Sequence, residues 1–274
     1  MQEIRVQSWN ELQDALFVES WNAELERYRS RFAYRGLSDA DYALETTLMR
    51  LGGPYVTLER HLLRNFKKYA HRKFVERDTL WNWLSVAQHY GLPTRLLDWS
   101  YSPLIALHFA TANINKFDRD GVVWAVSYLK VHQLLPDILQ DRLDNEGANV
   151  FTVEMLSETV TSLAQFEELA GRDSVVFFEP ASIDDRIVNQ FAFFSIMARA
   201  DMALNEWLVR HPEIYYRIII PADLKWEVRD KLDQANITER VLFPGLDGLG
   251  RWLTRHYSPK TETRQALRAF GHES

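Results

Sequence analysis

The stretch from residue 81 to 112 constrains the fold most, because polar side chains are set there between strongly apolar segments. Apolar residues such as Trp83 and Ala87 recur at helical spacing and predict a helix. Gly91 can adopt the left-handed backbone that ends a helix, and Pro93 cannot continue one. The chain must therefore turn between this helix and the element that follows it.

The second half of this stretch predicts a short strand and another helix. Residues 95–99 alternate poorly for an exposed strand but suit a short buried one. Ser102 then precedes Pro103, the pattern of an N-cap followed by a first-turn proline. Residues 104–112 are apolar nearly all round, which is typical of an interior helix.

Polar and charged side chains lie between these apolar walls, and a buried charge needs either a partner or a ligand. As a group they predict a functional site into which Arg35 also projects. The alternative is a structural network, in which Arg35 pairs with Asp98 and His89 bonds a main-chain carbonyl. We favour the site, because burying so many polar groups without a use is costly. The polar residues are His89, Thr94, Arg95, Asp98 and Ser100.

Composition narrows the class of protein. With 274 residues, of which 46% are hydrophobic, the chain can bury one substantial core, and we expect a single domain. The net charge of -6 argues against a general polyanion binder but leaves room for a local basic patch. The absence of cysteine excludes disulfides, thiolate metal sites and cysteine nucleophiles. No apolar run approaches the roughly 18 to 20 residues that span a bilayer, so we expect a cytoplasmic protein without a membrane partner.

Strand-like segments recur along the chain with helical segments between them. An opening strand is expected around Ile4 and Val6. In the next, residues 31–37, Arg35 directly precedes Gly36 at the strand end, so removing its guanidinium should cost little packing. The pattern predicts an α+β fold with a split, mainly antiparallel central sheet and flanking helices. The later strands are expected at 122–128, 174–179, 187–196, 215–220 and 240–243.

Two segments carry further expectations. Residues 131–172 are helical in pattern and acidic, and we interpret them as an inserted helical lobe at the margin that contributes little to the cleft. Within the predicted strand 187–196, Gln190 is the polar exception, which fits either a core amide or a ligand contact.

A basic tract closes the amphipathic helix expected at 57–74, and its cations beside aromatic residues could contact nucleic acid locally. Because charge runs on amphipathic helices usually face water, we favour a solvated face. The sequence has no Walker A, H-E-x-x-H or dinucleotide-binding glycine pattern, and we expect no metal site. The tract comprises Lys67, Lys68, His71, Arg72 and Lys73.

Several motifs in this sequence are specific enough to indicate a family. The most specific is HYGLPTRLLDW at 89–99, which Tyr34-Arg35-Gly36 precedes, and together the motifs resemble the FRG domain family. The resemblance implies one FRG-type domain over 1–274, with its core at about 31–252, and a role in bacterial or phage defence or as a toxin. Tyr34 replaces the family's phenylalanine, and Ala192 replaces a glycine. The remaining motifs are LETTLMR at 44–50, residues 186–190, Leu242-Phe243-Pro244 and Leu246-Asp247-Gly248.

The chain also resembles, more distantly, the ADP-ribosyltransferase fold. There an Arg-Gly, a Ser/Thr-containing strand that enters a helix, and a later acidic or amide residue surround NAD. Here Arg35-Gly36, residues 94–100 and Gln190 occur in that order. The resemblance implies NAD as substrate, with Arg35 on a pyrophosphate oxygen and an aromatic ring on nicotinamide. A transferase needs a carboxylate, which Gln190 lacks, so Asp98 or Glu179 would have to supply it.

The first hypothesis is therefore an NAD-dependent enzyme that cleaves the nicotinamide–ribose bond and transfers ADP-ribose to an unknown acceptor macromolecule. Its catalytic residues would be His89, Asp98 and Gln190. The alternatives are a non-catalytic module that binds a nucleotide or a partner, and a metal-independent nuclease that uses His89. A carboxylate facing Arg35 would favour the first. The expected NAD-binding residues are Arg35, Gly36, Tyr90, Thr94, Arg95, Trp99 and Ser100.

Overall fold

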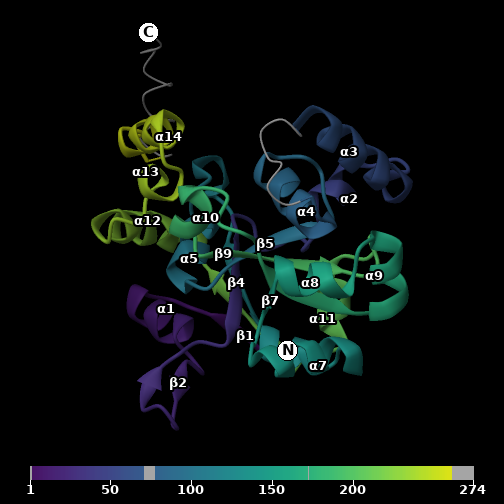
Figure 1. Cartoon of the computed structure of the whole chain (residues 1–274). Helices are drawn as coiled ribbons and strands as arrows, with labels where there is room; N and C mark the ends of the chain where they lie inside the picture. The colour runs from purple at the N-terminus through teal and green to yellow at the C-terminus, as the bar shows by residue number, and fades with distance from the viewer. Residues whose placement is uncertain (1, 71–77, 172, 261–274) are drawn as a thin grey trace.

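The computed structural model describes residues 2–70, 78–171 and 173–260. Its centre is an eight-stranded sheet with the order β1-β10-β6-β4-β5-β9-β8-β7 (Figure 1). A two-stranded hairpin of β2 (Trp21–Asn22) and β3 (Arg27–Tyr28) lies apart from it. In spatial order the strands are Gln2–Arg5, Tyr215–Ile220, Gly121–Ser127, Phe32–Leu37, Leu96–Ser100, Ala192–Met197, Val175–Glu179 and Phe151–Thr152.

The sheet is mixed but mostly antiparallel. Only the two edge strands run parallel to their neighbours, β1 to β10 and β7 to β8, and every other adjacent pair is antiparallel. Helices pack on this sheet throughout the described part of the chain, which confirms the prediction of an α+β fold with a mainly antiparallel sheet.

The sheet divides between β4 and β5. These strands are registered at a single pair, Tyr34 opposite Ser100. In contrast, β4 pairs with β6 along its whole length, and β5 does the same with β9. The two central strands therefore diverge from one point of contact, and the predicted split lies there.

Helices cover the two halves of the sheet differently (Figure 1). Beside β4, one face buries a core formed with α1 (Trp9–Leu16), α5 (Pro103–Ala110) and α12 (Lys225–Gln234). Beside β5, a second core is closed by α3, α4, α7, α8 and α9. The opposite face of both halves shares a third core with α6 and α11. The bounds are Tyr55–Ala70 (α3), Leu80–His89 (α4), Tyr128–His132 (α6), Asp137–Glu146 (α7), Val153–Thr159 (α8), Leu163–Ala170 (α9) and Leu204–Val209 (α11).

The last helices stand at the end of the molecule opposite the β2–β3 hairpin (Figure 1). They are α13 (Glu239–Leu242) and α14 (Leu246–His256). No described helix is both long enough and apolar enough to traverse a bilayer. The remaining short elements are α2 (Thr47–Leu51), α10 (Asp185–Asn189), and the 3-10 turns Ile114–Lys116 and Ala222–Leu224.

The packing of α5 on β4 explains the glycine after Arg35. A Cβ atom built on Gly36 would lie 1.7 Å from the carbonyl oxygen of Ala106 in α5. Only a residue without a side chain allows the helix backbone to approach the strand so closely. The interior position of α5, with Leu107 fully buried, agrees with its apolar sequence.

Of the predicted strands, the one at 187–196 is wrong in part and the one at 240–243 is wrong. Residues 187–189 belong to helix α10, which begins after Asp184 because that carboxylate accepts bonds from two main-chain N–H groups. The chain then reverses at Phe191, whose φ of 45° is left-handed, and β9 starts at Ala192. Gln190 thus lies in a helix-to-strand turn. Residues 239–242 form helix α13 instead of a strand.

Of the segment 131–172, the described residues 131–171 are mainly helical as predicted, but they do not form a marginal lobe. It supplies the edge strand β7, and its buried residues form a large part of the core beside β5. Phe151, Leu156 and Phe166 are fully buried there. The acidic composition of the segment did not predict this burial, because only the apolar face of each helix packs inward while the charges remain outside.

Candidate functional site

A cavity of about 170 Å³ opens where β4 and β5 diverge. We call it the split cavity. It collects a majority of the residues predicted for the site, together with Phe109, which the sequence did not single out, and Arg186, which belongs to the 186–190 motif. The predicted residues that line it are Arg35, Gly36, Asp98, Trp99, Ser100 and Gln190.

Arg35 and Asp98 face each other in the split cavity. The Arg35 Nη1 atom lies 2.5 Å from the main-chain carbonyl oxygen of Asp98 and 3.9 Å from its carboxylate Oδ2. The Arg35 side chain is 17% exposed and that of Asp98 is 57% exposed. Burial lowers the pKa of Arg35, the Asp98 carboxylate opposes this, and the positive charge of Arg50 adds to the lowering. A guanidinium nonetheless stays protonated, so the cavity holds a fixed cation beside an accessible carboxylate.

Asp98 is held by a short chain of hydrogen bonds. Its Oδ2 atom accepts from Gln88 Nε2 at 2.8 Å, and Gln88 Oε1 accepts from Thr94 Oγ1 at 2.5 Å. Thr94 itself is buried, and its main-chain N–H donates to Thr47 Oγ1 at 3.1 Å. Thr94 therefore orients the carboxylate indirectly and does not line the cavity, contrary to its predicted contact with NAD.

Ser100 and Gln190 are engaged by the protein. Ser100 Oγ donates to the main-chain oxygen of Gln190 at 2.8 Å, and Gln190 Nε2 donates to the carbonyl of Leu242 at 2.8 Å. These bonds fix the turn before β9 against α13. Both residues thus shape the wall of the cavity.

Of the two aromatic residues expected to bind NAD, Trp99 lines the split cavity and Tyr90 does not. Trp99 is buried, its Nε1 donates to Ser195 Oγ at 2.8 Å, and its ring packs against Phe177 with centroids 5.5 Å apart. With the residue only 2% exposed, stacking of its ring on a ligand is not supported. Tyr90 is exposed but lines a neighbouring pocket.

The prediction that Arg95 shares one pocket with Asp98 is wrong. Arg95 Nε donates to Glu59 Oε1 at 2.8 Å, and its guanidinium also bonds Glu167 and the carbonyl of Ala198. Burial alone would lower the pKa of Arg95, but its hydrogen bonds to Glu59 raise it. The buried charge had a partner on α3, 36 residues away in sequence, that no local pattern could indicate.

His89 is also outside the split cavity. Its Nε2 atom lies 2.7 Å from Asp184 Oδ2, and its side chain is buried. Because Asp184 also caps α10, His89 connects the end of α4 to the start of α10. Its expected catalytic contact with the same ligand as Asp98 is therefore not supported by the cavity that Arg35 lines.

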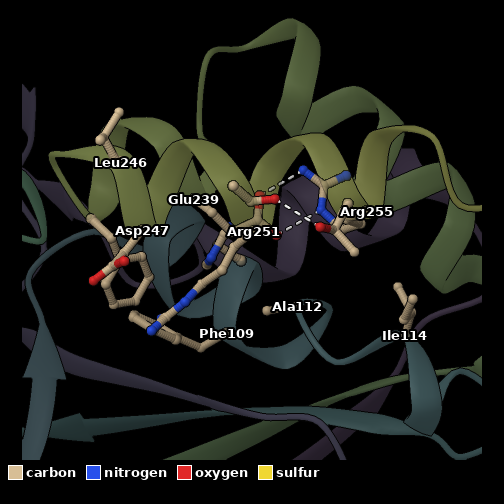
Figure 2. Close-up of a pocket in the computed structure, with 12 residues that line it drawn as sticks. Phe109, Ala112, Ile114, Glu239, Leu246, Asp247, Arg251 and Arg255 are labelled. Atoms are coloured by element: carbon tan, nitrogen blue, oxygen red, sulfur yellow. Dashed lines mark hydrogen bonds and ion pairs between the residues drawn. The ribbon is translucent and has the colours of Figure 1, made fainter.

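His89 lines a second depression of about 520 Å³, which we call the arginine pocket. Arg186 lines both the arginine pocket and the split cavity. Phe243 and Arg251 line the arginine pocket and a third depression of about 750 Å³, the helix hollow, shown in Figure 2. The three openings thus adjoin one another. The sequence motifs marked Arg186 and Phe243 but gave no sign that they meet near Asp98.

The basic tract on α3 is partly described. Lys67 Nζ lies 2.9 Å from an Asp78 carboxylate oxygen and near the Trp83 ring, and Lys68 lies against Tyr69. His71, Arg72 and Lys73 lie outside the described residues. Among the described residues, no three His, Cys, Asp or Glu side chains cluster in a way that could hold a metal ion.

Comparison with known proteins shows a family similarity over one part of the chain. The family model of the FRG domain matches residues 30–119, a span that includes β4, β5 and α5 and therefore both Arg35 and Asp98. Searches of curated proteins and of solved structures gave no match. Residues 30–119 of the chain are thus similar to the FRG domain family.

Proposed function

We propose that the split cavity binds the nicotinamide riboside end of NAD, and that the protein transfers ADP-ribose to an acceptor macromolecule. The observation that carries this is the accessible Asp98 carboxylate beside the buried Arg35 guanidinium, 3.9 Å apart, where the sheet divides. The distant resemblance to the ADP-ribosyltransferase fold supports the same function, since Arg-Gly and a later polar residue flank a split sheet here too.

Asp98 has the chemistry that the reaction needs. When the nicotinamide–ribose bond breaks, nicotinamide leaves with the bonding electron pair, and positive charge develops on the ribose. A fixed carboxylate stabilises that charge most when it is held in place before the reaction. The hydrogen bond from Gln88 holds Asp98 in this way. An acceptor nucleophile then bonds the anomeric carbon and loses its proton.

Arg35 serves the same site through its position. Its bond to the Asp98 carbonyl fixes the strand that carries the carboxylate. Its charge also offsets the negative charge of a dinucleotide at the cavity mouth. Gln190 cannot replace the carboxylate, because a neutral amide does not stabilise a cation comparably and its Nε2 is bound to Leu242.

The test is turnover of NAD labelled in the adenosine moiety, with release of nicotinamide measured for wild type, Asp98→Asn and Asp118→Asn. The Asp98→Asn change keeps the size of the side chain and an acceptor for Gln88 but removes the charge. Asp118 is a matched control, because its side chain is 71% exposed and lies outside all three openings.

We expect wild type and Asp118→Asn to release nicotinamide at the same rate and Asp98→Asn to be slower by about 100-fold or more, the usual effect of removing one preorganised electrostatic group. Label should also move to protein or nucleic acid added as acceptor. Equal rates for Asp98→Asn and wild type would refute the role of Asp98. Binding of NAD without nicotinamide release would replace the enzyme with a nucleotide-binding module.

A further inference from the structure

Two arginines from distant parts of the chain meet at one aromatic ring. The guanidinium carbon of Arg186, in α10, lies 5.0 Å from the centre of the Phe243 ring, and that of Arg251, in α14, lies 5.2 Å from it. Both arginines line the arginine pocket. Contact with an aromatic ring holds a guanidinium in a defined orientation.

The surrounding main chain is built to hold this arrangement. Asn189 Nδ2 donates to the carbonyl of Val241 at 2.9 Å, and Gln190 Nε2 donates to that of Leu242, so α10 is fixed to the end of α13. A Cβ atom on Gly248 would lie 1.8 Å from the carbonyl oxygen of Phe243, so α14 packs directly on the preceding turn. The main chain that carries the two arginines is therefore held in place by contacts that do not involve their charges.

Within the described residues, neither guanidinium has a carboxylate oxygen within 4.0 Å or donates a hydrogen bond. Arg255, one turn further along α14, behaves differently. It lies 2.6 Å from Glu239 and 2.7 Å from Asp233, as the dashed lines in Figure 2 show for the first pair. Figure 2 also shows Arg251 extending away from this pair toward Phe109. The fold thus neutralises one arginine of α14 and leaves the other available.

The position of the arginine pocket suggests which anion it receives. The split cavity, at about 170 Å³, is smaller than the roughly 300 to 1,000 Å³ typical of ligand pockets, so a dinucleotide must extend beyond it. The arginine pocket continues from it at Arg186 and leads to the helix hollow. That hollow has apolar walls from Phe109, Ala112 and Ile114, which suit a flat heterocycle (Figure 2).

We infer that Arg186 and Arg251 bind the diphosphate of a nucleoside diphosphate whose base occupies the helix hollow. Guanidinium groups match phosphate oxygens in geometry and charge. Asp185 and Asp247 also line the arginine pocket, and they disfavour a bare anion while offering acceptors to sugar hydroxyls. The site therefore favours a nucleotide over inorganic pyrophosphate. The inference rests on the proposed function in one respect, namely that the split cavity holds the nicotinamide riboside end of the same dinucleotide.

Calorimetric titration of the full chain with adenosine, AMP, ADP, ADP-ribose and inorganic pyrophosphate tests this. The variants are Arg186→Gln and Arg251→Gln, and Arg240→Gln is the control. Arg240 also packs on an aromatic ring, 4.9 Å from the centre of Trp252, but it lines none of the three openings. It therefore reports the effect of losing such a contact alone.

We expect wild type to bind ADP at least about tenfold more tightly than adenosine or pyrophosphate. Each pocket variant should weaken ADP by about tenfold or more and leave adenosine unchanged, while Arg240→Gln changes neither. ADP binding that is no tighter than adenosine binding, or that is equal in all variants, would overturn the inference. A single-stranded oligonucleotide that binds more tightly than ADP with the same arginine dependence would also overturn it, in favour of nucleic acid.

The two proposals fail separately. ADP lacks the nicotinamide riboside, so arginine-dependent ADP binding without any NAD cleavage would refute the proposed reaction and support the diphosphate site. NAD cleavage that depends on Asp98, with ADP binding insensitive to both arginines, would do the reverse.

Discussion

Arg35 donates a hydrogen bond from Nη1 to the main-chain carbonyl of Asp98 at 2.5 Å, across the gap between β4 and β5. Continuing the antiparallel register from Tyr34 and Ser100 would place Gly36 opposite Asp98. Because the strands diverge there, a side chain supplies the donor that a neighbouring strand would otherwise supply. Arg35 therefore has a structural role in addition to its charge.

Arg35→Ala should lower the free energy of unfolding by about 1 to 3 kcal/mol, because it leaves the Asp98 carbonyl without its donor. The sequence alone had suggested that the fold would be little affected. Urea unfolding measures the change, and Arg50→Ala is the control, since that side chain is half exposed and its ion pair with Glu45 is 4.0 Å long. If the two variants are equally stable, the bond across the split does not stabilise the fold.

Gly36→Ala should destabilise the protein by about 1 to 3 kcal/mol or more, because its Cβ would overlap the carbonyl of Ala106 and displace α5. Gly250→Ala, in α14, is the matched comparison, since its Cβ meets nothing within 4 Å and it should stabilise by about 0.5 to 1 kcal/mol. Thermal melting of both variants gives the comparison. If both variants shift the melting temperature in the same direction, the close contact between Gly36 and α5 does not determine the effect of the substitution.

Arg95→Met should cost about 3 to 5 kcal/mol, because it leaves the Glu59 carboxylate buried without its cation. The double variant Arg95→Met, Glu59→Leu should recover much of that loss, since neither charge then needs solvation. A double-mutant cycle by denaturant unfolding measures the coupling. Additive losses would mean that each side chain contributes through packing alone.

Stability should decrease between about pH 6.5 and pH 4 through His132. Its Nε2 accepts from the N–H of Phe177 and its Nδ1 bonds the carbonyl of Asn149, so the ring is neutral in the fold. Burial lowers the pKa of His132 to about 4 from an ordinary 6.5, although the Asn149 carbonyl opposes this. The unfolded chain therefore binds a proton that the native chain does not, which costs about 3 kcal/mol by pH 4.

The measurement is the free energy of unfolding against pH for wild type, His132→Gln and, as control, the exposed His256→Gln. His132→Gln should flatten part of the slope, and His256→Gln should leave it unchanged. The remainder should belong to His108, whose pKa is lowered to about 3 by burial and by Arg229. If the free energy of unfolding of His132→Gln varies with pH as steeply as that of wild type, other groups cause the pH dependence.

Local chemistry determined much of this protein from sequence alone. The helix that ends before Gly91, the strand after Thr94 and the apolar helix that begins at Pro103 all follow from turn residues and apolar periodicity. The same stretch, with Tyr34-Arg35-Gly36, was enough to indicate the FRG family. It also correctly placed Arg35 and Asp98 together.

Only the tertiary structure decided which polar groups are partners and which remain open. Glu59 neutralises Arg95, and Asp184 bonds His89, although nothing in the motif at 89–99 predicts these partners. Arg186 and Arg251 meet at one ring because α10 and α14 both pack against α13. Periodicity and turn chemistry act over a few residues, whereas the free energy of a buried charge depends on groups that only the folded chain brings near.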